Sequence, residues 1–135
     1  MADCVFCEII AGNVPAHVVL DAPDAVAFLD ARPLFKGHVL LVPREHHETL
    51  RDLPTELVGP LFLHARRLAG AVEQALAAQG SFVAMNNKIS QSVPHLHVHI
   101  VPRNPRDGLR GFFWPRHKYT SDEEAAEYAL KIRNA

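Results

Sequence analysis

The stretch His95-Leu96-His97-Val98-His99-Ile100-Val101 places histidines and apolar residues at alternate positions. Side chains alternate between the two faces of a β-strand, so an extended chain would present three imidazoles on one face. Leu96, Val98 and Ile100 would then lie on the other face, against a hydrophobic core. The alternation predicts a strand over residues 95–101, which ends at Pro102.

Outward from this strand, the hydrophobic pattern predicts four more strands and two helices. The strands are expected over residues 17–20, 25–30, 37–43 and 81–86, and the first two form a hairpin around the turn Asp21–Asp24. A long helix is expected over residues 54–79, with Gly80 as its C-terminal stop. Its apolar residues recur at spacings near 3.6: Leu57, Leu61, Leu68, Val72 and Leu76. A short C-terminal helix begins at Ser121, with acidic residues in its first turn.

The order of these elements indicates an α+β fold, because strands and helices do not alternate as they do around a parallel sheet. We expect a single domain over residues 1–135: an antiparallel five-stranded sheet with one long helix on one face and a short C-terminal helix. The chain is long enough to bury a substantial core.

Composition excludes several classes of function. Of the 135 residues, 48% are hydrophobic, and 15 acidic side chains balance 14 basic ones, so bulk charge does not favour a nucleic-acid or membrane surface. The chain has no apolar run that could span a bilayer and no signal-peptide pattern at its N-terminus, so we expect a cytoplasmic protein. One local basic cluster is read as a solvated face rather than a phosphate-steering patch: Arg103, Arg106, Arg110, Arg116 and Lys118.

The histidine face has three interpretations from the residues alone. A solvent-facing strand with incidental histidines is the least favoured, because three histidines in register are rare in strands. A metal site with three histidine ligands is the second. Phosphate chemistry is the third, with one imidazole attacking and its neighbours binding or protonating oxygens. The strand itself does not choose between the last two.

The wider segment Gln91–Arg103 resembles the signature of the histidine triad (HIT) family of nucleotide hydrolases and transferases. That signature, His-φ-His-φ-His-φ-φ with φ apolar, is matched at every position from His95 to Val101. The resemblance continues upstream through Phe28-Leu29-Asp30 and the run from Pro33 to His46, so it covers nearly the whole chain. The same family includes bacterial-type members with an N-terminal Cys-x-x-Cys pair.

The resemblance implies a role for each motif residue. His97 would attack an α-phosphate and form a nucleotidyl-histidine intermediate, while His99 and His38 would contact the transferred phosphate. Asp30 would accept the ribose hydroxyls of a purine nucleotide. The remaining substrate-binding positions are Gln91 and Ser92 on the phosphate, Phe28 and Ala31 along the base, and Asn86 at the start of the phosphate loop. A neutral imidazole nitrogen is a good nucleophile near neutral pH, and flanking donors stabilise phosphoryl oxygens.

The segment before the triad departs from the family pattern. Many members have a longer, glycine-containing loop between the asparagine and the glutamine, whereas this chain has Asn86-Asn87-Lys88-Ile89-Ser90-Gln91. Ser90 occupies a position where glycine is common. The departure concerns the shape of the phosphate loop and the choice of leaving group, not the nucleophile.

Cys4 and Cys7 are the only cysteines, which excludes a disulfide scaffold. A redox pair is disfavoured because such pairs follow a strand, and the remaining alternatives are two buried thiols or half of a zinc site. In the HIT members with this cysteine pair, zinc is completed by the histidine after the third strand and the first triad histidine. Carried over, the ligands of a structural zinc ion would be Cys4, Cys7, His46 and His95, with His47 as the neighbouring alternative to His46.

Two alternatives to a nucleotide hydrolase with a histidine nucleophile stay open. One is a non-catalytic purine-nucleotide-binding module, and the other is a catalytic metalloenzyme that uses all three triad histidines as ligands. By resemblance we also expect a homodimer that pairs the long helices and extends the sheet, without nucleic-acid or membrane partners. The segment around Trp114 is expected either to pack on its own core or to reach the nucleotide site or the partner subunit. His17, His64 and His117 carry no motif and are expected to be structural or exposed.

Overall fold

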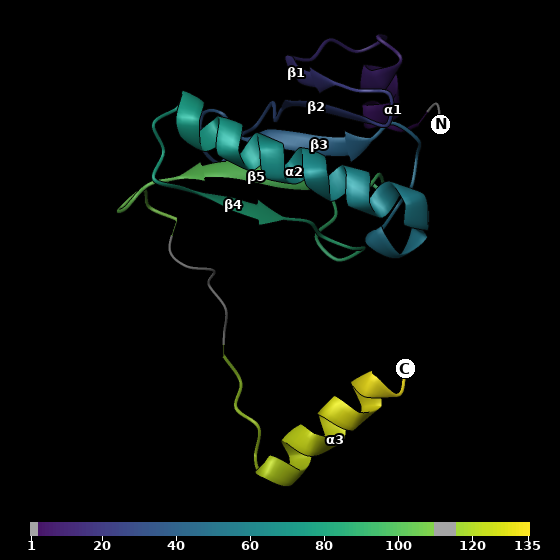
Figure 1. The fold of residues 1–135 in the computed structure, drawn as a ribbon, viewed down its shortest axis with the longest axis vertical. Helices are drawn as coiled ribbons and strands as arrows, with labels where there is room; N and C mark the ends of the chain where they lie inside the picture. The colour runs from purple at the N-terminus through teal and green to yellow at the C-terminus, as the bar shows by residue number, and fades with distance from the viewer. Residues whose placement is uncertain (1–2, 110–115) are drawn as a thin grey trace.

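Five strands form one antiparallel sheet in the computed structural model, which describes residues 3–109 and 116–135 (Figure 1). The order across the sheet is β1-β2-β3-β5-β4, so the histidine-bearing β5 lies between β3 and β4. The strands are β1 (Val18–Asp21), β2 (Ala25–Leu29), β3 (Val39–Pro43), β4 (Gly80–Ala84) and β5 (Val98–Arg103). The helices are α1 (Val5–Ile10), the 3-10 turn η1 (Leu50–Asp52), α2 (Thr55–Ala75) and α3 (Asp122–Arg133). The predicted α+β class, the five-stranded sheet and both predicted helices are confirmed.

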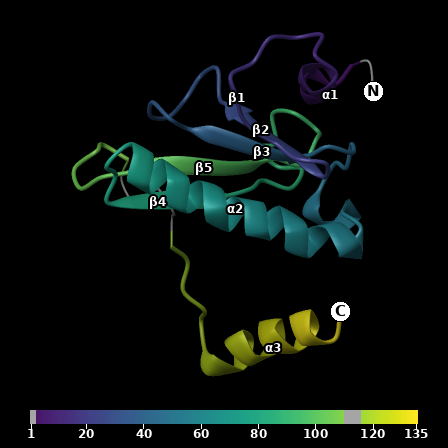
Figure 2. The same cartoon turned by 45° about the horizontal axis from the view of Figure 1, so that its top comes forward.

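Each face of the sheet is covered by a different helix (Figure 2). The long helix α2 packs Leu61, Leu68 and Val72 against one face, where Leu96, Val98 and Ile100 are fully buried. The short helix α1 lies against the other face, where its Phe6 joins an apolar cluster with β2 and β3. The predicted apolar side of the histidine strand is therefore confirmed, and on the other side His95 and His97 are also buried, whereas His99 is half-buried.

The bounds of β5 differ from those predicted. The strand begins at Val98 rather than His95, because residues 95–97 are held by other bonds: the Leu96 amide donates to the His47 carbonyl at 2.7 Å. It continues through Pro102 to Arg103, because β5 pairs with β4 as far as the Gly80–Arg103 pair, although its pairing with β3 ends at the Val39–Ile100 pair. The missing N–H of proline therefore costs no ladder bond to β3.

The predicted end of the long helix was also wrong. The helix stops at Ala75, and Gly80 is instead the first residue of β4. The residue that leaves the helix with left-handed geometry is Ala77, at φ 52°. Glycine is preferred at this position but is not required, so the glycine in the sequence pointed to the wrong place.

Two short elements were not predicted from the sequence, α1 and η1. The helix α1 has only six residues, and its N-cap is Cys4, whose thiol accepts a hydrogen bond from the Cys7 amide at 3.4 Å. Cysteine is not a usual helix-capping residue, so no standard start signal marked it.

The C-terminal helix α3 begins where predicted, with Ser121 as its N-cap accepting from the Glu124 amide at 3.1 Å. In both views α3 lies away from the sheet, and none of its residues is buried (Figures 1 and 2). Trp114 and Arg110 lie outside the described residues. Within the described part of the chain, no helix is long and apolar enough to cross a membrane.

Candidate active site and metal centre

Two of the three triad histidines belong to separate clusters of polar side chains. His95 lies with Cys4, Cys7 and His46, and His99 lies with Asp30 and His38. His97 stands between them, with its ring centroid 5.0 Å from that of His99. Because the rings separate in this way, the geometry does not favour one metal ion shared by all three triad histidines.

The ring of His97 has a defined tautomer. Its Nδ1 atom lies 2.8 Å from the backbone carbonyl oxygen of His95, and a carbonyl can only accept a hydrogen bond. Nδ1 therefore carries the proton of the neutral ring, and Nε2 keeps its lone pair. The side chain is 3% exposed. The result is an imidazole prepared for nucleophilic attack through Nε2.

A chain of hydrogen bonds sets the tautomers of His38 and His99 in the same way. The Leu34 amide donates to Nδ1 of His38 at 3.1 Å, so the proton of a neutral His38 ring must be on Nε2. That Nε2 lies 3.0 Å from Nδ1 of His99 and donates to it. The proton of His99 is then on its Nε2 atom. His99 is thereby left with an N–H donor, while both ring nitrogens of His38 are already engaged.

The electrostatics of the site keep these two rings neutral. Burial is the main cause that lowers the pKa of His99 to about 4, with further lowering from the neighbouring His97 and His38. Burial also lowers the pKa of His38, although the carboxylate of Asp30 opposes this effect. An Asp30 oxygen lies 3.7 Å from Nδ1 of His38. At neutral pH both imidazoles therefore act as neutral hydrogen-bonding groups.

The residues assigned to the sugar and the base lie at the end of β2. Phe28 is buried, and its ring meets that of Phe6 edge-on at 5.3 Å. Asp30 directly follows the strand, where one carboxylate oxygen accepts from the Arg32 amide at 2.9 Å. Ala31 is exposed. The structure thus places Asp30 beside the histidines, with the aromatic cluster next to it.

The loop between β4 and β5 is held by the side chains expected to bind phosphate. The Gln91 amide group donates to the Glu48 carbonyl at 2.6 Å and accepts from the Lys88 amide at 2.8 Å. The Asn86 side chain donates to the Ser90 carbonyl at 3.2 Å. In this geometry Asn86 and Gln91 shape the loop, and the exposed Ser92 follows it.

Two residues of this loop adopt the backbone conformation that glycine adopts most easily. Lys88 and Ser90 both have positive φ, at 69° and 60°. Such left-handed backbone favours glycine, and an L-residue there is strained. Ser90 has therefore kept the backbone shape that glycine would supply more easily.

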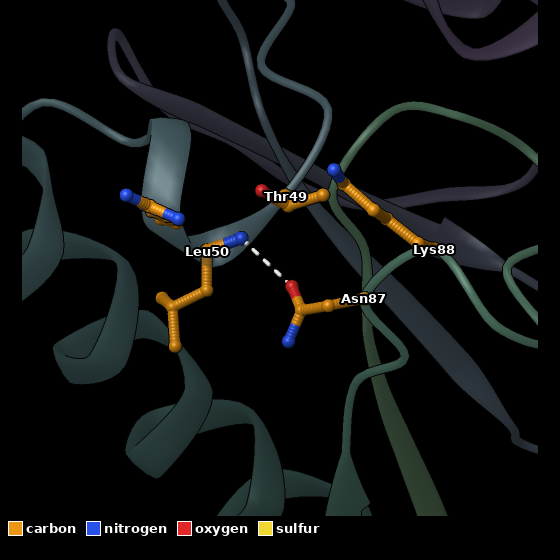
Figure 3. Close-up of a pocket in the computed structure, with 5 residues that line it drawn as sticks. Thr49, Leu50, Asn87 and Lys88 are labelled. Atoms are coloured by element: carbon orange, nitrogen blue, oxygen red, sulfur yellow. Dashed lines mark hydrogen bonds between the residues drawn. The ribbon is translucent and has the colours of Figure 1, made fainter. Parts of the chain in front are cut away.

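A pocket beside this loop lies between η1 and the start of the loop (Figure 3). Asn87 spans it, with its side-chain oxygen accepting from the Leu50 amide at 2.8 Å. The pocket is lined by Thr49, Leu50, Arg51, Asn87 and Lys88, and this lining includes none of the predicted site residues. The bond across it ties the loop to the segment that follows β3.

The second cluster brings two cysteines and two histidines together from three parts of the chain. Nδ1 of His95 lies 3.4 Å from Sγ of Cys4 and 3.6 Å from Sγ of Cys7, and Nδ1 of His46 lies 3.3 Å from Sγ of Cys7. All four ligand atoms lie within 4.8 Å of one another. His47, the alternative to His46, instead pairs its ring with Glu45.

The donor set fits zinc in chemistry and in spacing. His95 Nε2 lies 2.9 Å from the Pro43 carbonyl oxygen, so Nε2 carries the proton and Nδ1 faces the thiols with its lone pair. Tetrahedral zinc with its usual Zn–S and Zn–N bond lengths separates N and S ligands by about 3.5 Å. Burial and the neighbouring Cys4 raise the pKa of Cys7, and burial lowers the pKa of His95 to about 4, so the histidine is already in its ligating form near neutral pH. With four protein ligands, such a site would be closed.

Phe6 is the residue of this region that sequence reasoning missed. Its ring lies edge-on to those of His97 and Phe28, at centroid distances of 5.1 and 5.3 Å. It sits between the two cysteines in sequence, and that position was the available signal. Without a predicted helix at residues 5–10, nothing indicated which way the side chain pointed.

Comparisons with known proteins agree with this arrangement. The sequence profile of the HIT domain matches residues 11–106. An adenosine 5′-monophosphoramidase of Saccharomyces cerevisiae is 33% identical over 125 residues, covering 90% of this chain and 76% of that protein.

Two solved structures are similar over nearly the whole chain. A HIT family protein from Bacillus subtilis has a TM-score of 0.90 and 32% identity, covering 98% of this chain and 96% of that one. A zinc-bound histidine triad family protein from Mycobacterium smegmatis has a TM-score of 0.76 and 32% identity, with 98% of both chains covered. The chain therefore belongs to the HIT domain family.

Proposed function

We propose that this protein is a nucleotide hydrolase or nucleotidyl transferase that cleaves at the α-phosphate through a covalent intermediate on His97. The observation that carries the proposal is the bond from His97 Nδ1 to the His95 carbonyl, because it leaves the Nε2 lone pair as nucleophile. The phosphoramidase activity named for the yeast relative supports the same class of substrate.

The reaction would proceed by double displacement. The His97 Nε2 lone pair forms a bond to the α-phosphorus while the bond to the leaving group breaks, and the leaving group departs with its electron pair and takes up a proton from solvent. Water then attacks the phosphorus and loses a proton to solvent as the P–N bond breaks, and the nucleoside monophosphate is released with His97 restored. The His99 Nε2–H stabilises charge on a phosphoryl oxygen in each step. Asp30 would accept the ribose hydroxyls.

The preferred substrates are a purine nucleoside phosphoramidate or a dinucleoside polyphosphate. The test is a paired assay in which the parent protein and His97→Ala each receive adenosine 5′-phosphoramidate and diadenosine polyphosphates. AMP release by the parent alone would support nucleotidyl transfer to His97, and the faster substrate would identify the leaving group. If neither protein turned over but both bound AMP, the alternative of a non-catalytic purine-nucleotide-binding module would replace the enzyme.

We also propose that Cys4, Cys7, His46 and His95 hold a structural zinc ion. The spacing of the four ligand atoms and the zinc-bound relative support it. When bound, the ion would cross-link α1 to the start of the catalytic segment. Elemental analysis of untagged protein should find about one zinc per chain, and Cys4→Ser should lose metal and thermal stability. Val5→Ala, on the exposed side of the same helix, is the matched control. A parent protein without zinc after growth in zinc-containing medium would refute the site.

A homodimer is the proposed assembly. The outward face of α2 carries Phe62 and Leu63, which are 42% and 57% exposed, together with Gly59 and Gly70, whose α-carbons face open space. Exposed apolar and small residues on one helix suit close packing against a second copy. Light scattering should give twice the protomer mass for the parent protein, and Leu63→Glu should reduce the measured mass to that of one protomer. Val19→Glu, on the far edge strand β1, should leave the mass unchanged.

A further inference from the structure

Phe6 is the one buried residue of α1, and its ring packs against two of the triad histidines, His97 and His95. Its ring centroid lies 5.1 Å from that of His97, at an interplanar angle of 80°, and 5.9 Å from that of His95, at 71°. The nucleophilic ring is therefore bounded by Phe6 and by His99, whose centroid is 5.0 Å away.

The position of Phe6 depends on the two cysteines beside it. A six-residue helix has too few internal hydrogen bonds to be stable on its own, so tertiary contacts must hold it in place. Cys4 and Cys7 flank Phe6 in sequence and turn their thiols toward His95 and His46. Whatever fixes these four side chains also fixes the ring that packs against His97.

We infer that Phe6 is a positioning residue that couples the Cys4-Cys7-His46-His95 cluster to the orientation of the His97 ring. The Nδ1 bond to the His95 carbonyl holds one side of that ring, and the contact with Phe6 adds a second restraint on its orientation. An edge-on aromatic contact of this geometry is worth a factor of about 2 to 12 in the population of one ring orientation. The effect of the Phe6 contact on catalysis rests on the proposed function, whereas its effect on the orientation of the His97 ring does not depend on that function.

The test therefore begins with a measurement that needs no substrate. Nitrogen–proton correlation spectra of the histidine rings, recorded at one fixed pH, report the tautomer and environment of His97. In zinc-loaded parent protein we expect a single set of His97 signals with the proton on Nδ1. Phe6→Leu with full zinc content should shift or split these signals, and removal of zinc from the parent should do the same. Val5→Ala, which is 43% exposed on the same helix, should leave them in place.

Kinetics then separate positioning from a simple contact with the base. Under single-turnover conditions, Phe6→Leu should lower the rate of AMP release by about 2- to 12-fold with little change in KM. A rise in KM at constant rate would overturn the inference, because Phe6 would then act only as a wall of the nucleotide pocket. If Phe6→Leu does not fold, Phe6→Met keeps a long apolar side chain without the ring and replaces it.

The two hypotheses fail in different ways. Unchanged His97 signals in a folded, zinc-loaded Phe6 variant would overturn the positioning role, even if the parent released AMP. A parent protein without AMP release would remove the proposed function, while shifted His97 signals in the variant would still support the positioning role.

Discussion

Replacement of His38 by leucine tests whether His38 touches the phosphate or acts through His99. Both of its ring nitrogens are engaged, Nδ1 by the Leu34 amide and Nε2 by Nδ1 of His99. The side chain is 2% exposed, and leucine fills a similar volume, so the fold should survive. We therefore expect the variant to lose two hydrogen bonds, the one from the Leu34 amide and the one that orients His99, and only the second reaches the proposed catalytic residues.

The size of the effect distinguishes the two roles. One hydrogen bond contributes about 0.5–1.5 kcal/mol, which corresponds to about a 2- to 12-fold loss in kcat. Loss of a donor that contacts the reacting phosphate directly costs about 10²- to 10³-fold. The assay is steady-state AMP release from the better substrate, with thermal unfolding of each variant as the check on folding.

His38→Gln is the matched control, because its side-chain amide can reach the place of Nε2 and donate to His99. It should keep more activity than His38→Leu. A loss of 100-fold or more in both variants would refute the reasoning and return His38 to direct contact with the substrate. Equal moderate losses in the two variants would indicate that the ring must transfer a proton.

Three further predictions concern the loop and the titration of the site. Ser90→Gly should raise the free energy of unfolding by about 0.5–1 kcal/mol, since φ at this residue is 60°. In the same denaturation experiment, the control Ser92→Gly should lower it. Equal decreases in the free energy of unfolding of both variants would contradict backbone strain at Ser90. Gln91→Ala should speed amide hydrogen exchange across residues 87–91 and lower kcat/KM, because the Gln91 side chain joins the loop to Glu48. Exchange at the rate of the parent protein would refute this role of the Gln91 side chain. The pKa values of His38 and His99 are lower in the folded protein than in the unfolded chain, so the unfolded chain binds more protons and the free energy of unfolding should decrease as the pH is lowered from about 7 to about 4. His99→Gln should make this pH dependence shallower. An identical slope in the variant would exclude His99 as its source.

The elements that the sequence predicted well are those with a long or strongly periodic pattern. The strand pairs and the helix from Thr55 follow from apolar residues that must face a common core. The position of Ser121 also marked the start of α3 correctly, because a capping hydroxyl leaves a clear signal. The errors fall at ends: Gly80 did not stop the helix, and His95 did not start the strand.

The sequence predicted the residues of the site better than it predicted the hydrogen bonds between them. The resemblance to the HIT family implied which histidines and cysteines form the site, and the structure brings Cys4, Cys7, His46 and His95 into one cluster and Asp30, His38 and His99 into another. The sequence could not predict that His38 uses both ring nitrogens within the protein, or that the Gln91 side chain bonds within the loop. Those properties depend on the backbone groups nearby, such as the Leu34 amide and the Glu48 carbonyl, and backbone groups carry no mark in the sequence. Phe6 was missed for a related reason, because six residues are too few for periodicity to be read.

The distance along the chain between the two halves of the metal centre has a consequence during protein synthesis. Cys4 meets His95 across a separation of 91 residues. At the usual rate of translation, the cysteines are added to the chain about 5 to 18 s before the histidine that completes their set. During that interval the N-terminal thiols have no protein partner from the triad, and the central strand β5 has not yet been added between β3 and β4. Binding of the proposed zinc ion by the complete ligand set would therefore be among the last events in the maturation of the nascent chain.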